Sequence, residues 1–285
     1  MSTQITTARS QEFTTRVEHL VQQVGSRLRE CVETGSHTGK QAVPVDQIGT
    51  VTAVVKQGRH ADLPTVEVPH ARRWVLPTTY QFRDFIDNPD TLRMLWEPNN
   101  RYARAFANAL GRAVDDEIIT AFDASSTTGE AGSGSESFAS SQEIGTATLG
   151  MTVTKLRQAM ETFRAAEVSD DEEFYCVMAS DQIEDLMSET QVVSFDYNSN
   201  KVLVDGKITG FMGFNFKHSE RLGTSGGDRK VMAWAKSGMY LGLWEDMKTP
   251  IDWLPEKQSW QVAGTLDCGA TRLELQKVVR LLCSE

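Results

Sequence analysis

Hydrophobic and polar residues alternate along two runs near the start of the chain, 42–55 and 65–82, which the polar segment 56–64 joins. In the first run five apolar residues share one parity: Val43, Val45, Val51, Ala53 and Val55. This period of two predicts strands with two unlike faces. A strand of about 14 residues extends over roughly 45 Å, and an isolated two-stranded ribbon is marginally stable in water. We therefore expect a long β-hairpin arm that lies on other copies of the chain.

Two other segments repeat their apolar residues at steps of three and four, which predicts amphipathic helices. The first covers 8–33 and is expected to end near Gly35. The second covers 99–123, with an apolar stripe of Tyr102, Phe106, Ala109, Leu110, Ala113, Val114, Ile118 and Phe122. About 25 helical residues give a rod of roughly 37 Å, about twice the average helix length. We expect this helix to form the spine of a domain.

From residue 150 onward the pattern mixes helices with strands. The expected elements are helices at 152–168 and 181–189 and strands at 174–179, 202–204, 211–216 and 260–282. Asp181 is the expected N-cap of the second helix. The segment 230–244 is apolar throughout and fits a helix and a strand equally well. The Ser/Gly/Thr-rich segment 124–145 has the composition of a flexible loop, so we expect Glu136 within it to matter little.

Composition narrows the class of protein. The 285 residues are 40% hydrophobic and 24% charged, which is ordinary for a folded domain. The net charge of -10 argues against wrapping nucleic acid, because Lys and Arg drive phosphate binding. No apolar run reaches the ~18 residues of a membrane span, and the first residues do not resemble a secretion signal. The four cysteines are scattered and are expected to be reduced: Cys31, Cys176, Cys268 and Cys283.

The motifs of the sequence predict no catalytic, cofactor or metal site. Phosphate-binding loops, nucleophile elbows and zinc motifs are missing from the sequence. His60, His70 and Asp62 offer too few ligands for zinc and are expected to make polar contacts near the arm's tip. The consecutive acids 115–117 spread around a helix, which favours a solvated or salt-bridged face. Arg72 and Arg73 are expected to form ion pairs between subunits.

Six short motifs follow one another along the chain: Asp46–Gly49, Arg59–Asp62, Pro69–Arg73, Phe85–Asp87, Gly111–Ile119 and Gly269–Arg272. Through these motifs, and through the order of its parts, the chain resembles the major capsid proteins of tailed bacteriophages with the Hong Kong 97-type fold. The resemblance covers nearly the full length. Two surface-type segments, 80–83 and 97–102, depart from the residues usual in that family.

The resemblance implies an α+β fold with four named parts. These are an N-arm at 1–38, an E-loop hairpin at 39–85, a peripheral domain at 86–145 and 250–285 with its spine helix at about 99–123, and an axial domain at 146–249. The implied function is a shell subunit that forms pentamers and hexamers and closes an icosahedral head around double-stranded DNA, without sequence-specific DNA binding.

The resemblance also implies partners and a location. A separate scaffolding protein and a portal are expected partners, and a decoration protein is a further candidate. The protein would assemble in the host cytoplasm and reside in the virion, with no membrane contact. Contacts between subunits are expected at Arg59, His60, Asp62, Arg72 and Arg73.

Two alternatives stay open at this point. The first is the shell protein of a cellular nanocompartment with the same fold, which would enclose an enzyme rather than DNA. The second is an enzyme with a site in residues 150–250. That region offers only His218 and Cys176, far apart in sequence, as reactive side chains. The DNA content of purified particles would discriminate the two kinds of shell.

Overall fold

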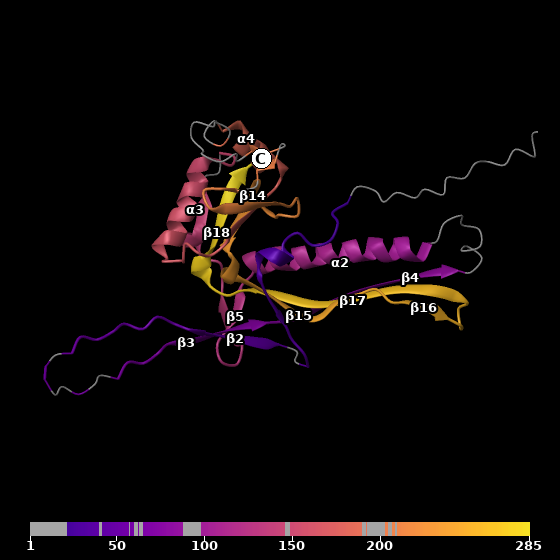
Figure 1. The fold of residues 1–285 in the computed structure, drawn as a ribbon, viewed down its shortest axis with the longest axis horizontal. Coiled ribbons are helices and arrows are strands. Elements are labelled where there is room, and N and C mark those ends of the chain that lie inside the picture. Colours follow the sequence, from indigo (N-terminus) through magenta and orange to yellow (C-terminus); the bar gives the residue numbers. More distant parts are fainter. Residues whose placement is uncertain are drawn as a thin grey trace, which may run out of the picture. The chain divides into compact units, whose positions relative to one another are not determined.

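A computed structural model describes residues 22–39, 42–56, 58, 59, 62, 65–87, 98–145, 149–189, 192, 203, 204, 207, 208 and 210–285. The chain divides into two compact units (Figure 1). Unit 1 comprises the residues up to Ser26 together with Thr79–Ala113 and Glu245–Leu266, and unit 2 comprises Arg27–Thr78, Val114–Trp244 and Asp267–Glu285. Four long elements contribute residues to both units, and each unit is described by itself.

Unit 2 is built on a mixed sheet in which seven of the described strands run in the order β11-β12-β8-β14-β18-β7, with β13 on β14. Their bounds are β7 Glu143–Gly145, β8 Phe174–Met178, β11 Gly210–Phe211, β12 Phe214–His218, β13 Thr224–Ser225, β14 Asp228–Ala235 and β18 Val278–Ser284. The central strand β14 is antiparallel to both of its neighbours, β8 and β18. All five residues of β8 are buried, as its continuous apolar run predicts.

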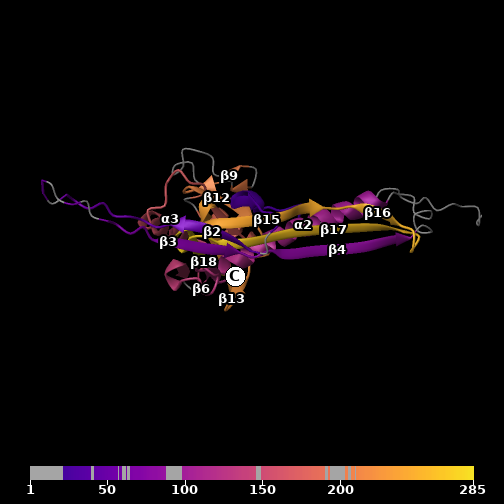
Figure 2. The same cartoon turned by 90° about the horizontal axis from the view of Figure 1, so that it is seen from below.

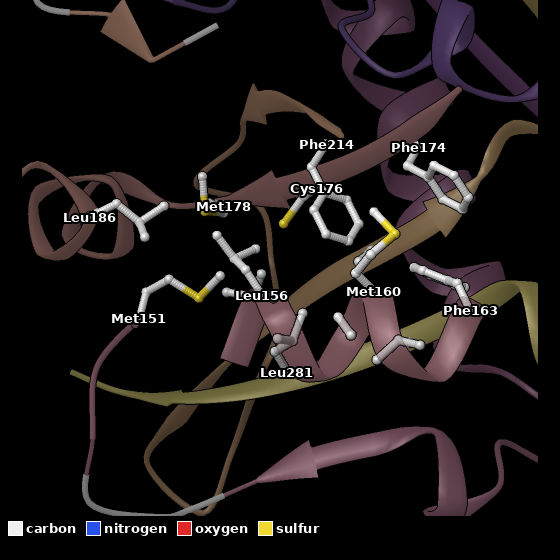
Figure 3. Packing of buried hydrophobic residues seen from close by; sticks show 14 of the residues in the cluster. Met151, Leu156, Met160, Phe163, Phe174, Cys176, Met178, Leu186, Phe214 and Leu281 are labelled. Carbon is white, nitrogen blue, oxygen red and sulfur yellow. The ribbon is translucent and has the colours of Figure 1, made fainter. Parts of the chain in front are cut away.

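Helix α3 (Val153–Ala165) and the short helix α4 (Ser180–Ser188) supply the other side of this core. Their apolar faces meet the sheet in one cluster, and Figure 3 shows side chains from α3 and from the strands pointing toward one another. The members that are nearly inaccessible include Met151, Leu156, Phe163, Cys176, Met178 and Phe214. Each such side chain contributes about 1.5–3 kcal/mol on burial.

A smaller sheet of unit 2 has the order β2-β3-β5-β6. Its strands are β2 Val43–Ile48, β3 His70–Val75, β5 Ser126–Thr128 and β6 Gly134–Glu136. All neighbours are antiparallel, with Asp46 opposite Arg72 and Trp74 opposite Thr127. This sheet joins the base of the arm to the hairpin 126–136.

The third sheet has the order β1-β15-β17-β16, with β4 paired to β17. Its strands are β1 Glu33–Ser36, β4 Thr78–Asp87, β15 Met239–Lys248, β16 Ile251–Leu254 and β17 Ser259–Arg272, and the long helix α2 spans Pro98–Asp123. Figure 2 shows β4, β17 and β16 running side by side. Within unit 1, the ring of Phe82 on β4 stacks on that of Phe106 on α2, with centroids 4.0 Å apart.

The remaining elements are short. They are the 3-10 turns η2 Arg29–Cys31, η3 Ser140–Gln142, η4 Lys236–Gly238 and η5 Leu275–Lys277, and the two-residue strands β9 Leu203–Val204 and β10 Lys207–Ile208. The segment 230–244, which fits helix and strand equally in the sequence, consists of β14, η4 and the start of β15. The predicted spine helix, the helix 152–168 and the strand 174–179 are confirmed as α2, α3 and β8.

Several predictions of local structure are wrong. Residues 22–28 are not helical, and η2 and β1 follow them; residues 8–21 of the predicted helix lie outside the described part of the chain. The reason is tertiary, because Leu28, Cys31 and Val32 are buried and Gly25 has a φ of 68°. The run 65–82 is also not one strand: β3 ends at Val75 and β4 begins at Thr78.

The segment 124–145 is more ordered than its composition suggests, since it contains β5, β6, η3 and β7. The predicted cap of α4 is also wrong. Ala179 occupies the N-cap position, and the N–H of Ser180 donates to the Glu220 carboxylate at 2.8 Å. A side chain from the turn after β12 therefore takes the place of a local cap.

Candidate functional site

The arm between β2 and β3 exposes apolar side chains to an unusual degree. Most of the large exposed hydrophobic residues in the described chain lie on it: Ile48, Val51, Val54, Val55, Val66 and Val68. Val55 is 83% exposed and Ile48 73%. Strand pairing holds only 43–48 to 70–75, and residues 49–56 and 65–69 carry no strand (Figure 1). Exposed apolar patches on folded proteins mark interaction sites, so the arm is the candidate functional site.

The base of the arm begins with an ion pair across the hairpin. Arg72 Nε donates to Asp46 Oδ1 at 2.5 Å, and Arg72 Nη2 donates to Asp46 Oδ2 at 3.2 Å. These hydrogen bonds lower the pKa of Asp46 and raise that of Arg72. The two residues face each other in the register of β2 and β3. The pair therefore supports the register that the backbone pairing of β2 and β3 sets.

Two further side chains tie the arm to one backbone carbonyl. Arg73 Nε donates to the carbonyl oxygen of Leu273 at 2.9 Å, and Gln47 Nε2 donates to the same oxygen at 3.2 Å. Arg73 also forms an ion pair with Glu136. Because Gln47 lies on β2 and Arg73 on β3, both strands of the arm are anchored at a single point.

The hairpin 126–136 contacts the arm along the edge of β3 that does not pair with β2. Trp74 Nε1 donates to the carbonyl of Gly129 at 2.7 Å, and the Trp74 ring lies over Gly132. Gly129 and Gly132 have φ of 89° and 70°, which glycine adopts without strain. A groove of about 690 Å³ lies between arm and hairpin, lined by Asp46, His70, Ala71, Arg72, Arg73, Thr128, Gly129, Glu130 and Glu136.

The residues predicted for contacts between subunits fall into two groups. Arg59 and Asp62 are exposed at the tip of the arm, and His60 lies outside the described residues. Arg72 and Arg73, expected to pair between subunits, hold carboxylates of their own chain. The charged residues described at the tip are therefore exposed, whereas the two arginines at the base form ion pairs within the chain.

Sequence reasoning missed three polar residues. Gln47 and Glu136 anchor the arm, and Asp115, assigned to a solvated or salt-bridged face, is fully buried. Its carboxylate accepts from the backbone N–H of Arg27 and of Leu28, each at 3.1 Å. The sequence did point to two of these residues, because Gln47 lies in the motif Asp46–Gly49 and Asp115 in the motif Gly111–Ile119.

The motif Gly269–Arg272 has a similar explanation. A Cβ at Gly269 would overlap the carbonyl oxygen of Leu76, so only glycine allows β17 to pass this close to the arm's exit. Arg272 is 1% exposed, and its guanidinium donates to the carbonyls of Phe122, Ala124 and Glu136 at 2.7–3.1 Å. This burial lowers the pKa of Arg272. The motif thus serves packing at the base of the arm.

The cysteines and His218 occupy structural positions and do not form a reactive site. All four cysteines are free and buried. Burial raises the pKa of Cys31 and Cys283 to about 11, that of Cys268 to about 12, and that of Cys176 further upward. Cys176 lies inside the core, whereas His218 is exposed and contacts Arg27 and Glu220. The pair does not form a nucleophile with its base.

The described residues contain no group of three or more His, Cys, Asp or Glu placed to hold a metal ion. None of the helices described is both long and apolar enough to cross a membrane.

Comparison with known proteins gives a consistent picture. The family model of phage capsid proteins matches residues 5–285, and none of the curated proteins matches the chain. The fold is similar to the capsid of cyanophage P-SCSP1u, with a TM-score of 0.79 at 13% identity over 100% of this chain and 96% of that one. The cyanophage Pam1 capsid gives 0.75 at 14% identity over 98% and 97%. A structure of Mycobacterium phage Che8 gives 0.70 at 13% identity over 96% and 97%.

Proposed function

Because the chain belongs to the phage capsid protein family, and is the major capsid protein of a tailed-phage head rather than an enzyme, we propose that it forms pentamers and hexamers that close an icosahedral shell around double-stranded DNA. The expected fold class, α+β of the Hong Kong 97 type, is confirmed over the whole chain. The homo-oligomeric shell and the virion location follow from the same findings.

The observation that carries the proposal is the exposed apolar arm. Its six large apolar residues are exposed in the described chain, and hydrophobic burial on a second copy would recover about 25 cal/mol for each Å² removed from water. Head-to-tail contacts of this kind use two different surfaces and close into rings when the rotation between successive copies closes. We propose that the arm is the E-loop and lies across the neighbouring subunit.

The finer assignments follow from this proposal. The N-arm would be 1–38, the E-loop 39–85, the peripheral domain 86–145 with 250–285, and the axial domain 146–249. Arg59, His60 and Asp62 would contact the neighbour at the arm's tip. Arg72 and Arg73 would contact the neighbour at the base of the arm.

The partners follow from the shell and from its charge. A net charge of -10 gives no basis for specific phosphate binding, so DNA would be enclosed rather than bound. A separate scaffolding protein would direct closure, a portal would occupy one vertex, and a decoration protein is a candidate for the outer surface. The family match favours DNA as the content over the cargo of a cellular nanocompartment.

Assembly of the purified protein tests the proposal. Co-expression with the scaffolding gene should give closed particles in sedimentation and electron microscopy, and particles from infected cells should contain DNA. Arg59→Ala should lower the yield of particles while the subunit stays folded. Arg157→Ala, which removes an exposed arginine from α3, is the matched control. A wild-type protein that remains a monomer under these conditions would contradict the proposal.

A further inference from the structure

We propose that the hairpin 126–136, here called the buttress, sets the direction in which the arm leaves the subunit, and that Arg73 and Glu136 are the positioning residues. The inference rests on the proposed role of the arm between subunits. It assigns a task to a segment whose Ser/Gly-rich sequence predicts a flexible loop, and to a glutamate expected to be dispensable.

The backbone supplies the first support. Strand β3 of the arm pairs with β2 on one edge and with β5 of the buttress on the other. The second pairing joins Arg73 to Thr128 and Trp74 to Thr127. The arm is therefore not an isolated ribbon at its base but part of a four-stranded sheet, half of which is the buttress.

The side chains supply the second support. The Arg73 side chain is 12% exposed and binds Glu136 of β6 while its Nε donates to the Leu273 carbonyl. The Glu136 side chain is 38% exposed, so the pair contributes little to the stability of the subunit, but it holds β3 of the arm to β6 of the buttress. Trp74 adds a hydrogen bond to Gly129 at the turn of the buttress.

The buttress is itself fixed to the body of unit 2. The buried guanidinium of Arg272 donates to the backbone carbonyl of Glu136 at 3.0 Å and to that of Phe122 at 2.7 Å. Ser126 Oγ donates back to the carbonyl of Arg272 at 3.1 Å. Both strands of the buttress are thus held by one residue of β17, so the buttress can transmit a fixed orientation to the arm.

The length of the arm makes its angle matter. About 13 residues separate Asp46 from Arg59, which gives a lever of at most roughly 43 Å. A rotation of about 10° at the base would move the tip by roughly 7 Å, whereas side chains in contact lie within about 4.5 Å. An arm without its buttress would stay folded at its base and miss its target on the next subunit.

Glu136→Gln tests this inference, with Glu130→Gln as the matched control. Both remove one negative charge from the same hairpin, but only Glu136 pairs with Arg73. We expect the Glu136 variant to keep its melting temperature as a subunit and to lose at least tenfold in shell yield, with Glu130→Gln close to wild type. The swap Arg73→Glu with Glu136→Arg should recover part of that loss.

A distance measurement covers the case in which yield falls for another reason. Spin labels at Val55→Cys and Ser133→Cys, both exposed, would report the arm against the buttress, because the four native cysteines are buried. The distance distribution should broaden in Glu136→Gln and not in Glu130→Gln. Wild-type yield, an unchanged distribution, or equal loss in both variants would overturn the inference. Failure of the wild-type protein itself to form shells would instead contradict the proposed function.

Discussion

The core of unit 2 and the arm use the same apolar residue types in opposite ways. Val231 and Val279 of the core are 0% exposed, whereas Val55 of the arm is 83% exposed. The core valines lie on β14 and β18, which have neighbours in the sheet and α3 across one face. Beyond its base, the described residues of the arm, such as 49–56 and 65–69, carry no strand. The comparison separates what one chain stabilises alone from what only an assembly can stabilise.

The largest effect on the subunit is expected in the core. Phe163→Ala removes a ring that is fully buried beside Phe174 and Phe214. The change should lower the free energy of unfolding by about 3–5 kcal/mol, because it leaves a cavity. Urea denaturation of the unassembled subunit measures it. A loss below about 1 kcal/mol would mean that this core is not what stabilises the subunit.

A smaller loss in the free energy of unfolding is expected when the buried carboxylate that binds the backbone at Arg27 and Leu28 is removed. Asp115→Ala removes the acceptor of the Arg27 and Leu28 N–H groups, and unsatisfied buried donors cost about 1–3 kcal/mol. Asp116→Ala is the control. Asp116 pairs with Arg221 at the surface, where such pairs contribute about 0–1 kcal/mol. Equal losses in the two variants would remove the distinction between them.

A weaker effect on the free energy of unfolding is expected at acidic pH, where Glu220 becomes protonated. Hydrogen bonds from Ser180 and His218 lower the pKa of Glu220 to about 2 from its ordinary 4.5. A lowered carboxylate pKa stabilises the folded state above the ordinary value, and this stabilisation is lost as pH falls from about 4.5 toward 2. The side chain is 50% exposed, so the effect should stay below about 1 kcal/mol. Glu220→Gln should flatten that part of the stability–pH curve, and an unchanged curve would refute the assignment.

The smallest effect on the subunit is expected in the arm. Val55→Ser should change the free energy of unfolding by no more than about 0.5 kcal/mol, as for other surface substitutions, yet it should reduce shell yield. Val231→Ser is the control, since it places a hydroxyl in the core and should lower the free energy of unfolding by about 1–3 kcal/mol. If Val55→Ser shells form normally and melt at the wild-type temperature, the exposed face of the arm is not an interface.

Sequence patterns predicted the parts whose partners are near in sequence. The stripe from Phe106 to Phe122 is a local feature, so α2 could be located almost to the residue. Residues 22–33 repeat the same pattern, but Gly25 has a φ of 68° and the backbone N–H of Arg27 donates to Asp115, almost 90 positions away, so tertiary contacts set the local structure there. Glu136 was misjudged for the same reason, because only the folded chain brings it to Arg73. The exposure of the arm was predictable, since no segment of comparable length was available to cover it.

The hydrogen bonds that Gln47 and Arg73 donate to the Leu273 carbonyl also bear on the order in which parts of the chain fold. Gln47 and the carbonyl that it binds are 226 positions apart in the chain, and contacts between such distant residues are slow to form because a long loop must close first. We therefore expect the arm to acquire its fixed direction late in folding, after the strand that ends beside Leu273 is in place. If the arm makes the contact between subunits proposed above, subunits with an unfinished core would associate poorly, and the folding kinetics of the chain would keep them out of the growing shell.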